Sequence, residues 1–286
     1  MGADLPTCRS SFPVPGSDAK KDSGRGSGQG MEAHHMDLTR TSGKVRREEF
    51  VFGGYLIVRG VEKPDWISDK VRCSPIWAIT DCICGFIPCH GLLPGTSLSS
   101  EEQREFSHVT GLKAESVASL KSEIEEMLAQ KTMGWPNTFI SLESASALYR
   151  KYLQRAENHR ILGIAFSGEA AKELVADAAA PPRIPCGMAE LLVERQEIPA
   201  NSRILGFEIL GLEYCGSFHS FLCNGLEADY SEKLSITLNE TGRIDTWEEA
   251  RRAADYTNDE SVGAEPVPWY PCLVFEPTTF PRHREA

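Results

Sequence analysis

Short β-branched and aromatic runs are interleaved along this chain with amphipathic helix patterns, without strict alternation. The runs typical of strands cover residues 55–59, 160–164, 203–207 and 272–275. Helical spacing is clearest at 114–130, where Val117, Leu120 and Ile124 share one face. A doubly wound parallel sheet requires regular alternation of strands and helices. The pattern therefore predicts an α+β fold, a single compact domain with a mixed sheet and several amphipathic helices.

Capping residues define further helices. Ser99 and Ser100 precede two glutamates, which predicts a helix that runs to about residue 109. Ser167 predicts a helix to about residue 179, and the amphipathic pattern at 142–153 predicts another. Asp245 or Thr246 is expected to cap a last helix. The apolar stretch at 74–86 is compatible with either a strand or a buried helix.

One phrase occurs twice. Arg-Ile-Leu-Gly stands at 160–163 and again at 203–206, and each copy is predicted to form a strand. A single repetition does not by itself establish a duplicated domain. The second copy leads into residues 215–217, where Ser217 is expected to cap a short helix that Gly225 ends.

The first 49 of the 286 residues differ in composition from the rest. They are rich in Gly and Ser, show no apolar periodicity and include the low-complexity piece 24–30, so we expect a disordered tail. Met31 and Met36 are alternative starts to Met1. Residues 50–286 are expected to form the single α+β domain.

The charge is concentrated in that predicted domain. The tail holds 8 Lys and Arg against 7 Asp and Glu, which leaves 22 basic and 34 acidic residues from Phe50 onward. Because Lys and Arg supply most of the affinity for phosphates, this excess argues against a nucleic-acid ligand. It suits a basic protein partner better than nucleic acid, and it also suits a surface that only maintains solubility.

The cysteine count and hydropathy indicate a compartment. Nine cysteines are an odd number, and no secretory signal opens the chain, so reduced thiols and a cytoplasmic location are expected. No apolar run reaches the length of a membrane span. No nucleotide-binding loop, nucleophile elbow or metalloprotease helix is present, and no cofactor is predicted. The tryptophans are expected to anchor the core and loops.

A cluster of soft ligands lies in the apolar stretch. Cys82, Cys84, Cys89 and His90 fall within nine residues, and zinc prefers such ligands. Their spacing is unlike that of structural zinc sites, and they are embedded among apolar residues. Buried thiols without a metal are therefore the first interpretation, and a metal site is the alternative.

The segment 216–225 is the most suggestive chemically. On a helix, His219 and Cys223 would share a face, which is compatible with a thiol nucleophile and an imidazole base. Cys215 is an alternative thiol near the expected helix start, where the helix dipole lowers a thiol's pKa. No orienting third group is identifiable in the sequence. A core histidine that is hydrogen-bonded to backbone is the competing interpretation.

The segments 55–63, 134–137, 216–227 and 263–269, together with the two Ile-Leu-Gly strands, resemble a group of uncharacterised stand-alone bacterial proteins. The resemblance spans residues 55–276 and implies no catalytic or binding residue. Some members of the group are similar in size and acidity to immunity proteins that neutralise toxins. The resemblance therefore implies, by analogy, an immunity-type role.

Two functions follow from these observations. The first is a soluble cytoplasmic protein that binds a basic protein, with an immunity-type inhibitor of a basic toxin as its specific form. Its binding carboxylates are expected at Glu101, Glu102, Glu123, Glu125 and Glu126. The alternative is a hydrolase or transferase that uses Cys215, His219 and Cys223.

Overall fold

The computed structural model describes residues 46–80, 84, 98–134, 138–153, 158–177, 186–212 and 218–277. The strands are β1 (Phe50–Arg59), β2 (Met133–Gly134), β3 (Thr138–Phe139), β4 (His159–Ser167), β5 (Ser202–Leu212), β6 (Phe218–Ser220) and β7 (Trp269–Pro277). The α-helices are α1 (Ser100–Thr110), α2 (Ala114–Ala129), α3 (Leu142–Leu148), α4 (Gly168–Asp177), α5 (Cys186–Glu194), α6 (Leu226–Leu234) and α7 (Trp247–Thr257). Three short 3₁₀ helices cover Arg47–Glu49, Phe221–Asn224 and Glu260–Val262, and a π-helical turn, Tyr149–Leu153, extends α3.

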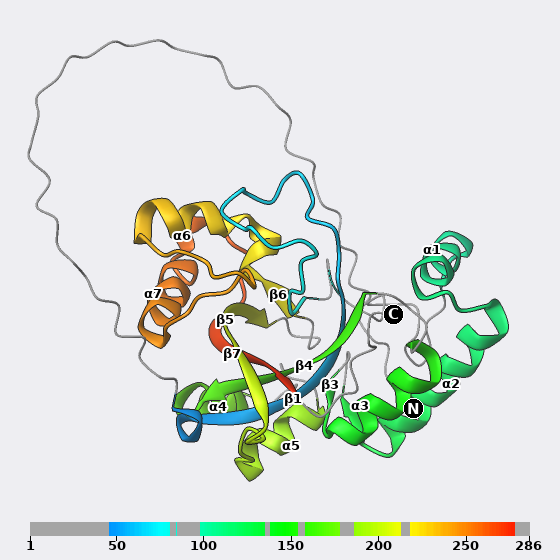
Figure 1. Cartoon of the computed structure of the whole chain (residues 1–286). Coiled ribbons are helices and arrows are strands. Elements are labelled where there is room, and N and C mark those ends of the chain that lie inside the picture. The colour runs from blue at the N-terminus through cyan, green and yellow to red at the C-terminus, as the bar shows by residue number, and fades with distance from the viewer. Residues whose placement is uncertain are drawn as a thin grey trace, which may run out of the picture. The chain divides into compact units, whose positions relative to one another are not determined.

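The predicted α+β class is confirmed, but the sheet is not mixed. Its strands follow the order β2-β3-β1-β4-β7-β5-β6, and Figure 1 labels all of them except β2. Every strand pair in the described part of the chain is antiparallel. The expectation of parallel pairs was wrong because strand direction depends on how the long connections cross the sheet, which local patterns do not encode.

The sheet consists of two halves of the same design. In one half β1 lies between β3 and β4, and in the other β5 lies between β6 and β7. Both long strands carry a bulge at a glycine with nearly the same backbone angle, Gly54 at φ 123° and Gly206 at φ 124°. Gly54 faces Ile164 and Gly206 faces Val274, and these two partners face each other where the halves meet. The pairing thus follows an approximate two-fold axis at the Ile164 and Val274 pair.

This symmetry reinterprets the repeated phrase. The two copies lie in β4 and β5, on opposite sides of β7. The bulges match β5 with β1, so the two copies occupy different places in their halves. The two copies share apolar residues because both belong to strands that are buried in the sheet.

Side-chain alternation divides the core between the two faces of the sheet. On one face Tyr55, Phe207 and Phe275 pack with residues of α2, α3, α6 and α7. On the other face Leu56 and Val274 pack with residues of α4 and α5. Helices therefore cover both faces of the sheet (Figure 1).

Local signals located most of the helices. The helices expected after Ser99, at 114–130, at 142–153 and after Ser167 are present. Thr246 is the residue that caps α7, because its hydroxyl accepts the Glu249 backbone N–H. Within the described ranges, no helix is long and apolar enough to cross a membrane.

The chain after β1, residues 60–80, forms no helix or strand. Of the stretch 74–86, residues 74–80 and 84 are described, and they form neither a helix nor a strand. Ile76 makes an isolated antiparallel bridge to Val61, and Ile79 packs on the sheet face that α4 and α5 cover. Tertiary contacts rather than local hydrogen bonds therefore hold this segment. The greater part of the expected tail, residues 1–45, lies outside the described residues.

Candidate functional site

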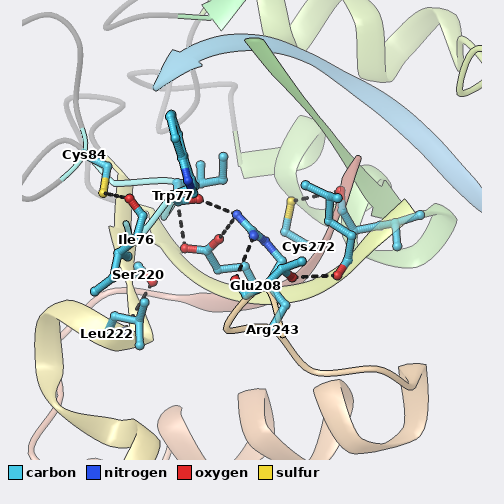
Figure 2. Close-up of polar contacts among 12 residues, drawn as sticks. Ile76, Trp77, Cys84, Glu208, Ser220, Leu222, Arg243 and Cys272 are labelled. Carbon is cyan, nitrogen blue, oxygen red and sulfur yellow. Dashed lines mark hydrogen bonds and ion pairs between the residues drawn. The ribbon is translucent and has the colours of Figure 1, made fainter. Parts of the chain in front are cut away.

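A buried ion pair joins Glu208 of β5 to Arg243, which precedes α7. Glu208 and Arg243 have side chains that are 2% and 3% exposed, and their charged atoms are 3.3 Å apart (Figure 2). Burial raises the pKa of Glu208, and the Arg243 guanidinium opposes this shift. Neither residue stood out in the sequence, because a glutamate in a strand shows its burial only in the folded sheet.

This pair holds the irregular segment against the sheet. The Ile79 backbone N–H donates to Glu208 Oε1 at 2.8 Å, and the Arg243 guanidinium donates to the Trp77 carbonyl (Figure 2). Isolated buried charges are costly, whereas these charges are both paired and hydrogen-bonded. The arrangement is a structural clamp with little access for a ligand.

His219 and Cys223 do not share a helix, so that expectation was wrong. His219 lies in β6, opposite Gly211 of β5, and Cys223 lies in the 3₁₀ helix that follows. Hydrogen bonding to β5 favours the extended backbone at 218–220. Ser220 caps the 3₁₀ helix, which ends at Gly225 as expected. Cys215 and Ser217 are outside the described residues.

The structure adds partners to both side chains. The Cys223 thiol and the Thr80 hydroxyl are hydrogen-bonded at 3.0 Å. Glu265 Oε1 lies 3.8 Å from Nδ1 of His219, which is almost fully buried. Glu265 thus places a carboxylate near His219, which the sequence did not indicate. Its position 46 residues beyond His219 gave no local signal.

The structure describes no arrangement of ligands at the alternative metal site. Cys82, Cys89 and His90 lie outside the described residues. Cys84 is buried, its thiol donates to the Ile76 carbonyl at 3.5 Å, and burial raises its pKa to about 12. Among the residues that the structure describes, no group of three potential ligands is close enough to hold a metal ion.

The predicted binding carboxylates lie on α1 and α2. Glu101, Glu125 and Glu126 are exposed, whereas Glu123 is half-buried and forms an ion pair with Lys151 at 2.5 Å. Glu102 lies in α1, and the structure describes its backbone only. Three of the five predicted carboxylates are therefore accessible on these helices.

A second acidic region surrounds a cleft between α4 and α7. β4 pairs with β7 only over residues 272–275 and then turns into α4 at Ser167, so the first residues of β7 lack β4 as a neighbour. The resulting cleft has a volume of about 490 Å³. Its walls are formed by Ser167, Glu169, Ala170, Glu173, Trp247, Arg251, Ala254, Asp255, Asn258 and residues 268–271. No sequence pattern indicated this site, since its walls come from three distant segments.

One tryptophan departs from the expected role as an anchor of the core. Trp66 is 55% exposed, whereas the nearby Ile67 and Val71 are buried. The Ser68 backbone N–H donates to Glu227 Oε1 at 2.7 Å. Glu227 is buried, and this desolvation raises its pKa. A buried carboxylate of α6 therefore holds the turn that presents Trp66.

Comparisons with known proteins identify no relative. No protein-family model, curated protein or solved structure matches this chain.

Proposed function

We propose that the chain binds a basic protein, and that its specific role is immunity-type inhibition of a basic toxin in the cytoplasm. The observation that carries this proposal is the cleft between α4 and α7, which presents carboxylates beside an aromatic ring. The sequences of α4 and α7 contain six acidic and three basic residues. Complementary charge accelerates association and selects among partners. Cys73, Cys84, Cys223 and Cys272 are free thiols, as expected in a reducing compartment.

A photocrosslinker at position 251, within the cleft, tests the proposal in the native host. The captured protein is then purified, and its dissociation constant is measured at about 50 and 200 mM salt. We expect a basic protein whose affinity falls several-fold at the higher salt. An acidic partner, or affinity that does not change with salt, would contradict the proposal.

Two variants of equal charge locate the contact. Glu169→Gln with Asp255→Asn removes two carboxylates from the cleft, and Glu125→Gln with Glu126→Gln removes two from α2. We expect the cleft variant to weaken binding and the α2 variant to leave it nearly unchanged. The reverse result would place the partner on α2. Growth of cells that produce the captured protein, with and without this chain, tests the immunity role.

A second candidate is a hydrolase or transferase that uses a thiol and His219. The observation that favours it is the Glu265 carboxylate beside His219, because such a carboxylate orients a catalytic imidazole. A catalytic thiol alkylates rapidly near neutral pH. Iodoacetamide labelling of the native protein, followed by peptide mapping, tests Cys215 and Cys223. Slow labelling, with a lower melting temperature for His219→Ala, would assign the segment a structural role.

A further inference from the structure

The cleft between α4 and α7 has walls that are fixed by internal hydrogen bonds. The Tyr270 hydroxyl donates to Glu173 Oε1 at 3.2 Å. The Asn258 side chain donates to the backbone carbonyl of Trp269 and accepts its N–H, both at 2.9 Å. Ser167 caps the first turn of α4. These groups are already engaged and hold α4, α7 and β7 around the cleft.

Two carboxylates remain available, one on α4 and one on α7. Glu169 is in the first turn of α4, and Asp255 is in α7. Both are exposed and line the cleft. Within the described ranges, neither side chain makes a hydrogen bond or an ion pair. They are therefore free to bind a ligand that enters from solvent.

The charge of the cleft favours a cation. Glu173 adds a third carboxylate, and Arg251 is the one cation among the lining residues. Arg195 lies close by, because its Nη2 atom is 3.1 Å from the position that a Cβ of Gly168 would take. Even when Arg195 is included, carboxylates exceed cations by three to two. A cationic ligand gains from this balance, and an anion is disfavoured.

An immobilised aromatic ring completes the site. Trp247 lines the cleft and is half-buried. Its ring packs edge-on against Phe50, with centroids 5.4 Å apart at 83°, and against Phe207 at 5.8 Å. Trp is the strongest partner among the aromatic residues for a cation above its face. Because Trp247 is already held in place, ligand binding costs little conformational entropy at this side chain.

We propose that this cleft receives an arginine side chain of the partner. A guanidinium is planar, binds a carboxylate through two parallel hydrogen bonds and stacks on tryptophan. The cleft supplies carboxylates on two walls and Trp247 beside them. This inference rests on the proposed function and deepens it, since it names the group by which a basic protein is recognised.

The test uses a small probe that needs no knowledge of the partner. Nα-acetylarginine amide is titrated into the full chain, and the indole N–H resonance of Trp247 is followed by NMR. The neutral analogue Nα-acetylcitrulline amide is the matched ligand control. We expect saturable binding of the arginine probe, with the citrulline probe about tenfold weaker or more, as for the loss of one charged hydrogen-bond partner. Glu169→Gln with Asp255→Asn should lower the affinity for the arginine probe by about fivefold or more.

Glu232→Gln with Glu240→Gln, at two exposed positions that do not line the cleft, is the matched protein control, and it should leave binding of the probe unchanged. Equal responses to both probes, no saturable shift, or equal weakening in both double variants would overturn the inference. A basic partner that binds although the probe fails would leave the proposed function intact and reject only the arginine site. Specific binding of the probe, with an acidic partner captured in cells, would reject the proposed function instead.

Discussion

Glu208 and Arg243 form a buried ion pair, and both side chains also hydrogen-bond to the backbone of residues 77–79. Glu208 accepts the Ile79 N–H, and Arg243 donates to the Trp77 carbonyl. The segment that follows β1 is therefore held by hydrogen bonds to two residues that also form an ion pair with each other. This dependence makes the effect of removing one charge predictable.

Arg243→Met should destabilise the protein by about 3–5 kcal/mol, because it leaves Glu208 buried without its counter-charge. The free energy of unfolding, measured in urea at pH 7, checks this. Adding Glu208→Gln should restore part of the loss. Arg203→Ala, which removes the more exposed ion pair with Glu276, should cost less than about 1 kcal/mol. Equal losses for Arg243→Met and Arg203→Ala would contradict the role of the buried pair.

Glu227 should make stability depend on pH. Desolvation raises its pKa in the folded state above the usual value of 4.5. The unfolded chain therefore loses this proton first as the pH rises, so the contribution of Glu227 to stability is complete below 4.5 and declines up to the raised pKa. Glu227→Gln keeps an acceptor for the Ser68 N–H and lacks this titration.

The measurement is urea unfolding from pH 4 to pH 8. The free energy of unfolding of the native chain, relative to Glu227→Gln, should fall with pH in that window and then remain level. Glu232→Gln, at an exposed position on the same helix, is the control. A difference that does not vary with pH would show that Glu227 has the same pKa in both states.

Gly206→Ala should cost about 2 kcal/mol or more. The residue has φ 124°, and an added Cβ would lie 2.8 Å from the Ile244 carbonyl oxygen. Gly225→Ala is the matched control, because Gly225 also has a positive φ but nothing within 4 Å of the Cβ position. Its cost should be about 1 kcal/mol. Thermal or urea unfolding of both variants checks this, and equal losses would contradict the larger cost expected at Gly206.

Protein purified without chelator should contain far less than one equivalent of zinc. Cys84 is buried among apolar side chains, and the spacing of Cys82, Cys84 and Cys89 is unlike that of structural zinc sites. Elemental analysis checks the content. Stoichiometric zinc that is lost in Cys82→Ala with Cys84→Ala would establish the metal alternative.

The same burial predicts how the described thiols react. Cys84 and Cys272 are buried and their pKa values are raised, so neither should react with iodoacetamide in the native state. Both should react after unfolding in urea, as mass spectrometry of the peptides will show. Rapid labelling of Cys272 in the native protein would mean that β7 opens locally.

Local chemistry in the sequence determined the class of fold and most helices. Ser99, Thr246 and the spacing of Val117, Leu120 and Ile124 act within a few residues, and the helices begin and run as these signals predict. The strand cores were visible for the same reason. β4 and β7 are buried strands, and their apolar runs can be recognised in the sequence without knowledge of the strands they pair with.

Only the tertiary structure decided strand direction, the location of charges and the sites. His219 adopts a strand because β5 offers it hydrogen bonds, and Glu265 reaches it from a distant loop. Glu208 and Arg243 are 35 residues apart, and the cleft joins α4, α7 and β7. The energies that set these arrangements belong to pairs far apart in the chain, so no window of sequence contains both members.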